Sequence, residues 1–286
     1  MKFAWIDRHV EQFEVLVMCE TLELSKSGYY AWKHRPASAR RRRREQLVEQ
    51  IQAAHDQSRC TYGSPRVTVE LKTSGVSVCE NTVARYMRAA GIRSKIKRRF
   101  RVVTTDSKHD HPIAMNVLDR SFEAEAPDRK WCVDITYIPT GEGWLYLAAV
   151  IDLFSRKIVG WSMADHLRSD LCLDALSMAI QRRRPGPGLL HHSDRGVQYA
   201  CEAYRAFLDR HQIEPSMSRT GNCYDNAVME SFFKTLKTEL VYHEIYATRD
   251  AARLSIFEYV EVFYNRQRRH SAIGYQSPEA FEAGLS

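Results

Sequence analysis

Three acidic residues in the C-terminal half of the chain have the types and spacing that metal-dependent phosphoryl transfer requires. Asp134 lies within the strand-like segment WCVDITYIP, Asp194 follows the apolar run LLHHS, and Glu230 lies in a helical pattern. The interval between Asp194 and Glu230 is 35 residues. Carboxylate oxygens suit Mg²⁺ or Mn²⁺. We therefore expect these three residues to be catalytic and to hold two metal ions per active site.

The positions of Asp134 and Asp194 suggest a functional role for both carboxylates. An aspartate is unfavourable inside a strand, and burying it costs several kcal/mol unless it is paired or bound to a metal. An ion pair with an arginine is the alternative for Asp134. Asp194 ends its strand before an Arg-Gly turn, and ligands gather at such strand ends. The neighbouring His191 and His192 alternate between faces, so neither is expected to bind metal.

Glu230 is placed by the apolar pattern of its helix. It lies about 200° around the helix from the apolar stripe, at roughly 100° per residue. Lys234 and Lys237 follow on its own face, where we expect them to hold DNA, although a surface Glu/Lys ladder would have the same pattern. Asp225 or Asn226 is the expected helix N-cap. The stripe consists of Val228, Phe232, Leu236 and Leu240.

The composition indicates a folded protein with an anionic partner. The 286 residues are 44% hydrophobic, with a net charge of +7 and a pI near 9.0, which favours nucleic acid over a membrane. The seven cysteines are dispersed without a CxxC pair, as expected for reduced thiols. The charged opening segment and the short apolar runs predict neither a secretion signal nor a membrane span. We expect a cytoplasmic protein.

The catalytic residues require a mixed sheet to position them. Three strand patterns, at residues 130–139, 144–153 and 157–164, are separated by short turns and predict an antiparallel meander. A helix at 169–183, a strand at 189–193, a helix at 201–211 and a strand at 213–217 follow. This order predicts an α/β fold, a ribonuclease H-like mixed five-stranded sheet with flanking helices. A crossover would place the fourth strand beside the first, and Asp194 near Asp134.

The N-terminal third is predicted to be all-α and to bind DNA. Residues 1–45 form a helical segment with a basic arm, Arg40 to Arg44, and Val10, Phe13 and Cys19 are predicted to share one stripe of its first helix. Residues 46–101 form a helix-turn-helix region, in which Arg85 and Arg88 lie on the polar face of the second helix. Arg98 and Arg99, in the basic run that follows, are expected to contact phosphates. Residues 102–129 form a linker, and residues 130–286 form the catalytic core with a C-terminal helical extension.

Several motifs resemble those of one family. The segments VDITYI, HSDRGVQY and SRTGNCYDNAVMESFFKTLK, with the 35-residue interval, resemble the core of DDE transposases and retroviral integrases. YGSPRVTVEL and YNRQRRHSAIGYQSP extend the resemblance to insertion-sequence transposases of the IS-three family, in particular their larger downstream-frame protein.

The resemblance implies a metal-dependent polynucleotidyl transferase with Asp134, Asp194 and Glu230 as its triad. Water first frees a 3′-hydroxyl at the element end, and this hydroxyl then attacks a second phosphodiester. The implied partners are double-stranded DNA, further copies of the chain on that DNA, and an upstream-frame protein or fusion with a helix-turn-helix and a coiled coil. Leucine heptads of such a coiled coil are not found in this sequence. The implied location is the bacterial-type nucleoid.

Two other interpretations remain. The chain could be a DNA-binding module whose ribonuclease H-like core is inactive and serves assembly or regulation. It could also be a tyrosine recombinase built on Tyr264, Arg268 and His270, which would need a covalent tyrosyl intermediate. Against that idea, Tyr264 would pack in the interior while Arg268 binds phosphate. The presence of all three carboxylates favours the transposase.

Overall fold

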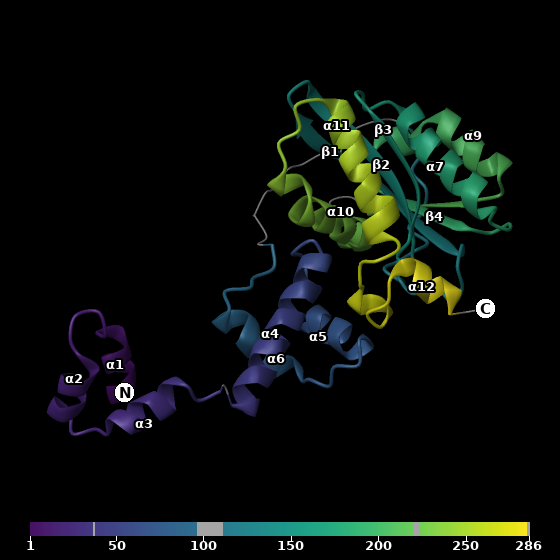
Figure 1. Ribbon diagram of the computed structural model, residues 1–286. Helices are drawn as coiled ribbons and strands as arrows, with labels where there is room; N and C mark the ends of the chain where they lie inside the picture. The colour runs from purple at the N-terminus through teal and green to yellow at the C-terminus, as the bar shows by residue number, and fades with distance from the viewer. Residues whose placement is uncertain (37, 96–110, 220–222, 285–286) are drawn as a thin grey trace.

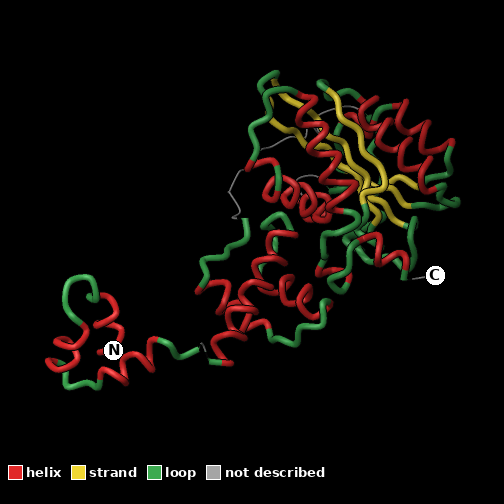
Figure 2. The backbone as a smooth tube through the Cα atoms, viewed as in Figure 1, coloured by secondary structure: helices red, strands yellow, loops and turns green. Residues whose placement is uncertain are grey.

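The computed structural model describes residues 1–36, 38–95, 111–219 and 223–284. Figures 1 and 2 show an N-terminal helical unit, a second helical unit and a C-terminal α/β unit built around one sheet. None of the described helices has both the length and the apolar composition needed to cross a bilayer. The helices of the first two units are α1 (Lys2–Arg8), α2 (Val15–Thr21), α3 (Lys26–Lys33), α4 (Ala39–Gln57), α5 (Ser64–Thr73) and α6 (Glu80–Ala89).

The sheet has five strands in the order β3-β2-β1-β4-β5. β1 to β3 form an antiparallel meander, and β4 and β5 pair in parallel, with β4 beside β1. This arrangement confirms the predicted mixed five-stranded sheet and puts β1 at its centre. The strands are β1 (Lys130–Thr140), β2 (Gly143–Asp152), β3 (Ile158–Ala164), β4 (Leu190–Ser193) and β5 (Glu214–Met217).

Helices cover both faces of the sheet (Figure 1). On one face, alternate residues of β1 and β2 pack with α10, α11 and the π-helical turn Tyr259–Tyr264. On the other, the remaining alternate residues pack with α7, α8 and α9. The peptide of α7 approaches so closely that a Cβ at Gly160 would lie 2.2 Å from the Ala175 carbonyl oxygen. The helices are α7 (Ser169–Arg183), α8 (Val197–Ala200), α9 (Glu202–Arg210), α10 (Ala227–Glu239), α11 (Arg249–Glu258) and α12 (Pro278–Ala283).

The N-terminal unit differs in detail from its prediction. It contains three helices around a small core of Ile6, Met18, Cys19 and Tyr29. Val10 and Phe13, expected on the same helical stripe as Cys19, lie in the connection between α1 and α2 and are exposed. The prediction was wrong because the amides of residues 12 and 13 bond the His9 carbonyl and turn the chain there.

The second unit has the helix-turn-helix order that was predicted. α5 begins with proline in its first turn, and α6 buries Val83 and Met87 against α4 and α5. The five consecutive arginines belong to α4 itself, which Ser38 caps by accepting a hydrogen bond from the Arg41 amide. The basic arm is therefore an exposed helical turn.

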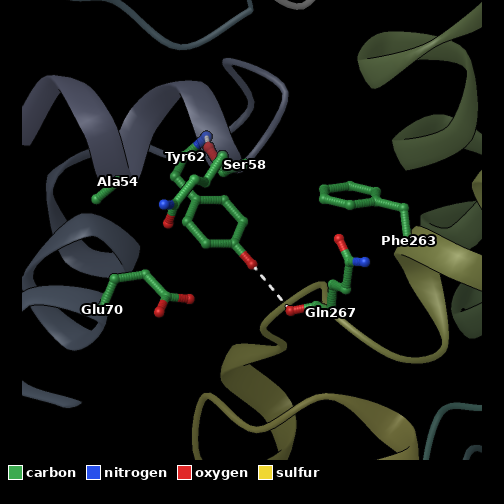
Figure 3. A pocket seen from close by; sticks show the side chains of 7 residues that line it. Ala54, Ser58, Tyr62, Glu70, Phe263 and Gln267 are labelled. Atoms are coloured by element: carbon green, nitrogen blue, oxygen red, sulfur yellow. Dashed lines mark hydrogen bonds between the residues drawn. The ribbon is translucent and has the colours of Figure 1, made fainter. Parts of the chain in front are cut away.

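The second helical unit docks against the C-terminal segment of the α/β unit. The Tyr62 hydroxyl accepts a hydrogen bond from the Arg269 amide at 2.7 Å and donates to the Gln267 carbonyl at 3.4 Å (Figure 3). Arg269 also forms an ion pair with Glu70. These contacts border a cavity of about 160 Å³ that contains none of the three carboxylates. Its lining is Ala54, Gln57, Ser58, Tyr62, Glu70, Phe263 and Gln267.

The predicted linker, residues 102–129, is described from residue 111 onward. Within that stretch Leu118 is buried in the core beneath α10 and α11. The amides of Val117 and Leu118 both donate to the Ser216 hydroxyl on β5. This part of the segment is thus packed against the sheet.

Candidate active site

Asp134 and Asp194 are brought together by the parallel pairing of β1 with β4. Cys132 lies opposite His192, and the pairing ends there. The same register carried two residues further sets Asp134 level with Asp194, beyond the point where the two strands separate. Asp134 has the same parity as Cys132 and therefore faces the α10 side of the sheet. Both aspartates are partly exposed at this opening.

Backbone amides orient both aspartate side chains. Asp134 Oδ1 accepts a hydrogen bond from the Ile135 amide at 2.8 Å. Asp194 Oδ1 accepts one from the Gly196 amide at 2.9 Å, in the turn that leads into α8. An ionised carboxylate can accept several bonds, so a side chain oriented in this way can also bind a cation.

Glu230 faces outward from the first turns of α10. Met229, Phe232, Phe233 and Leu236 are buried by the helix, while Glu230 is exposed. Phe232 and Leu236 confirm the predicted apolar stripe, with Val228 and Leu240 partly buried at its edge. Partial burial raises the pKa of Glu230.

The negative charges of Asp194 and Glu230 both act on the Asp134 carboxyl. Its pKa is raised well above the usual range by burial, then by the negative charges of Asp194 and Glu230. The Ile135 amide and the Lys237 ammonium act in the opposite direction. Like charges this close oppose ionisation until a cation joins them.

The donor chemistry suits a hard divalent cation. Over the described ranges, no cluster of three or more His, Cys, Asp or Glu side chains is tight enough to hold a metal ion. The three carboxylates nevertheless offer oxygen donors in one locality, and their mutual repulsion is what Mg²⁺ or Mn²⁺ would relieve. Glu230 lies on an exposed helix face, and its charge acts on Asp134.

The start of α10 is tied directly to β1. The side-chain Nδ2 of Asn226 donates a hydrogen bond to the Val133 carbonyl at 3.1 Å, next to Asp134. Asn226 is buried, and Glu230 follows it by one helical turn. This single bond therefore links the position of Glu230 to that of Asp134. Asn226 occupies the predicted N-cap position of α10, but its side chain makes no hydrogen bond to the helix.

Asp225 anchors the same helix start from the other side. Its fully buried carboxylate accepts hydrogen bonds from the Arg219 amide at 2.9 Å and guanidinium at 2.9 and 3.0 Å, from Arg120 at 3.0 Å, and from Asn116 at 2.9 Å. These bonds, those from Arg219 first, hold the pKa of Asp225 well below its usual range. Its predicted N-cap role is replaced by this clamp. The Asp-Asn sequence before the helix signalled a cap but not the contact with Arg120, 105 residues away.

The two lysines of α10 lie in different surroundings. Lys234 is exposed, whereas Lys237 is half-buried. Burial lowers the pKa of Lys237 and the charge of Asp134 raises it. Lys237 Nζ lies 4.9 Å from the centroid of the Tyr137 ring, an aromatic contact that the sequence pattern had not indicated.

The paired histidines have hydrogen-bonding partners on opposite faces of β4. His191 bonds the Tyr204 hydroxyl at 2.9 Å, and His192 bonds the hydroxyls of Ser216 and Ser218. Burial lowers the pKa of His191 to about 3 and that of His192 to about 4. Both are therefore neutral at pH 7, and they lie on opposite faces as their alternation predicted.

The expected DNA contacts divide into three groups. Arg85 and Arg88 lie exposed on α6, while Arg98 and Arg99 fall outside the described residues. Arg268 is 5% exposed and forms a two-pronged ion pair with Glu239 at the end of α10. The predicted phosphate contact of Arg268 is therefore abandoned. A pattern of charges in the sequence does not distinguish a surface arginine from a buried one.

Tyr264 is equally unsuited to attack DNA. It is 3% exposed, and burial raises the pKa of its hydroxyl. Its ring packs against Phe232 and His270. The recombinase interpretation requires an accessible tyrosine, so it is discarded.

Comparison with known proteins extends the family resemblance to nearly the whole chain. Sequence models of the integrase core domain match residues 124–223 and 211–278, and a model of an HTH-like domain matches residues 42–100. The chain is 43% identical to the transposase InsF for insertion sequence IS3A of Escherichia coli (strain K12), over 99% of this chain and 98% of that protein. The chain belongs to the IS3 transposase family.

Other proteins are also similar to this chain. The transposase is 45% identical to the insertion element IS600 uncharacterized 31 kDa protein of Shigella sonnei, over 92% of this chain and 97% of that one. Among solved structures, a simian T-cell lymphotropic virus intasome chain is similar with 14% identity and a TM-score of 0.48, over 82% of this chain and 74% of that one. The HTLV-2 integrase catalytic core in complex with magnesium is similar with 15% identity and a TM-score of 0.43, over 56% and 99%.

Proposed function

We propose that Asp134, Asp194 and Glu230 of this transposase hold two Mg²⁺ or Mn²⁺ ions and catalyse phosphodiester hydrolysis and strand transfer at the ends of a mobile element. The observation that carries the proposal is the shared electrostatic environment of the three carboxylates. β1 and β4 supply two of them at one level, and α10 supplies the third.

The reaction proceeds as two displacements at phosphorus. Water forms a new P–O bond while the bond to the element's 3′-oxygen breaks, which leaves a 3′-hydroxyl. That hydroxyl then forms a P–O bond with target DNA as the target's own 3′-oxygen leaves. In each step the attacking oxygen loses a proton and the departing 3′-oxygen gains one. Bound metal supplies activation of the attacking oxygen and stabilisation of the leaving one. The carboxylates hold the metal, while Lys234 and Lys237 hold the phosphate backbone.

The remaining DNA is bound elsewhere on the chain. Arg85 and Arg88 face outward from α6, where they contact duplex DNA of the element end. Arg98 and Arg99 contribute phosphate contacts. The transposase acts as an oligomer on two DNA ends, together with an upstream-frame protein or as its fusion, in the nucleoid of a bacterial cytoplasm. The partner and the oligomer rest on the family membership.

The test is strand transfer of a pre-cut DNA end in the presence of Mg²⁺. Wild type is expected to join the end to target DNA, and Asp194→Asn is expected to bind DNA but not to join it. Asp209→Asn, on the exposed face of α9, is the matched control and should join normally. Equal joining by wild type and Asp194→Asn would overturn the metal assignment. No joining by either, even with the upstream-frame protein added, would favour an inactive core.

A further inference from the structure

An aromatic pair lies toward the tip of the β1–β2 hairpin, with Tyr137 three residues beyond Asp134 on β1. Tyr137 and Trp144 meet edge to face, with ring centroids 4.8 Å apart and planes at 78°. Trp144 is 46% exposed. Alternation along β1 puts this pair on the face opposite to Asp134, beyond the part of the sheet that α7 covers.

Lys237 connects the aromatic pair to the active site. β4 no longer pairs with β1 beyond Cys132, so one edge of β1 is open beside Asp134. The Lys237 ammonium reaches this edge from α10, lies 4.9 Å from the Tyr137 ring centroid, and is close enough to Asp134 to alter its pKa. The Lys237 ammonium, the half-buried Tyr137 ring and the exposed Trp144 indole thus form a row that begins beside Asp134.

Contacts with residues 246–249 hold the hairpin that carries Trp144 in place. The Gly141 amide donates to the Tyr246 carbonyl at 2.8 Å, and a Cβ at Gly141 would lie 2.5 Å from the Ala247 carbonyl oxygen. Arg249 donates through Nε to the Trp144 carbonyl at 3.1 Å. The indole is therefore held at a set position before any ligand arrives, which lowers the entropic cost of binding.

The aromatic pair also contains a polar group whose hydrogen bonding is not satisfied by the described residues. The Tyr137 hydroxyl is buried and has no hydrogen-bond partner among the described residues. A buried polar group without a partner is unfavourable, as is an indole left in water. The cost of the exposed indole falls if a flat ring system covers Trp144.

We propose that Trp144 is a stacking platform for an unpaired nucleobase of the DNA strand in the active site. Tyr137 braces the indole, and Lys237 binds the adjoining phosphate. The base is unpaired because a paired base within a duplex does not offer its ring face to a protein side chain. The proposal rests on the proposed strand-transfer function and names how the strand is held there.

The test uses DNA ends with 2-aminopurine at each single-stranded position flanking the scissile phosphate. Stacking quenches the fluorescence of this base, so metal-free binding to wild type should lower it at one position. Trp144→Ala should abolish that quenching and weaken binding of the end by about 5- to 150-fold, the equivalent of one base–aromatic stack. Trp144→Phe should restore most of both. Phe257→Ala removes another exposed aromatic, on α11, and should leave both unchanged.

The outcomes separate this proposal from the proposed function. Asp194→Asn should quench like wild type while failing to join DNA. Quenching lost in Trp144→Ala, in a preparation where no protein joins DNA, would support the platform and contradict the strand-transfer proposal. Normal joining by wild type with equal quenching by Trp144→Ala would overturn the platform alone. A fall in oligomer size without any change in quenching would show that Trp144 binds protein instead. If Trp144→Ala does not fold, two other variants test the proposal. Lys237→Gln should weaken binding of the DNA end, and Trp144→Phe should still quench the fluorescence. Unchanged binding by Lys237→Gln would contradict the phosphate contact.

Discussion

Replacing Asp225 by asparagine tests whether the clamp at the start of α10 sets the position of Glu230. The substitution keeps the size of the side chain but removes its charge, and it points an N–H₂ group at donors of Arg120, Arg219 or Asn116. Removing one partner of a buried ion pair costs about 3–5 kcal/mol. Both arginines are nearly half exposed and can regain water, so we expect a loss of about 2–3 kcal/mol of unfolding free energy.

The pH dependence of that loss has a definite sign. The folded-state pKa of Asp225 is depressed, so its contribution to stability is fully present above the unfolded pKa of about 3.9. It is lost as the pH falls through the folded pKa. The stability difference between wild type and Asp225→Asn should therefore be constant from pH 7 down to about 5 and shrink below about 4. Urea unfolding at these pH values measures it.

Activity should fall further than stability. A misplacement of about 1 Å at a catalytic group can cost about 100-fold in rate, so single-turnover joining by folded Asp225→Asn should fall by that order. More Mg²⁺ should also be needed for half-maximal rate, which partial unfolding alone would not produce. Asp119→Asn, at an exposed residue that also contacts Arg219, should change stability by less than about 0.5 kcal/mol. The reasoning fails if Asp225→Asn joins DNA at the wild-type rate and Mg²⁺ requirement.

Three further outcomes are expected. Glu239→Gln leaves the Arg268 guanidinium buried without its counter-charge, so urea unfolding should show a loss of about 3–5 kcal/mol, and unchanged stability would contradict the burial. The pKa of Asp134 is raised and protons compete with metal, so the Mg²⁺ concentration for half-maximal joining should rise as the pH falls. This rise should begin at a pH above the titration range of an ordinary aspartate. A Mg²⁺ requirement that does not change with pH would contradict the raised pKa. Replacing Arg85 and Arg88 together by alanine should reduce the slope of log binding constant against log salt by about 2, measured by anisotropy, and an unchanged slope would remove α6 from the DNA interface.

The regular elements were predictable because their residue patterns are local. Alternating apolar residues identified β1 to β3 to within two residues at each end, and the stripe around Phe232 and Leu236 identified α10. The order of strands and helices then led to the five-stranded sheet. The exposed side of α10 that carries Glu230 also followed from the helical period, because burial repeats with that period.

Features that depend on distant partners were not predictable. Asp225 and Asn226 have the sequence of a helix cap, but their actual partners, Arg120 and Val133, are about a hundred residues away along the chain. Arg268 has the composition of a phosphate-binding run, and only the tertiary structure shows that it faces Glu239. In each case a partner far along the chain, which no local pattern reveals, helps to set the role of the side chain.

Binding of Mn²⁺ to the DNA-bound transposase tests the central claim most directly. Free Mn²⁺ can be followed by electron paramagnetic resonance while metal is titrated into the complex with a pre-cut end. Wild type and Asp209→Asn should each bind roughly two ions per protomer. Asp134→Asn, Asp194→Asn and Glu230→Gln should each lose at least about tenfold in affinity. Wild-type Mn²⁺ binding in all three variants would contradict the proposal that these carboxylates form one metal-binding unit.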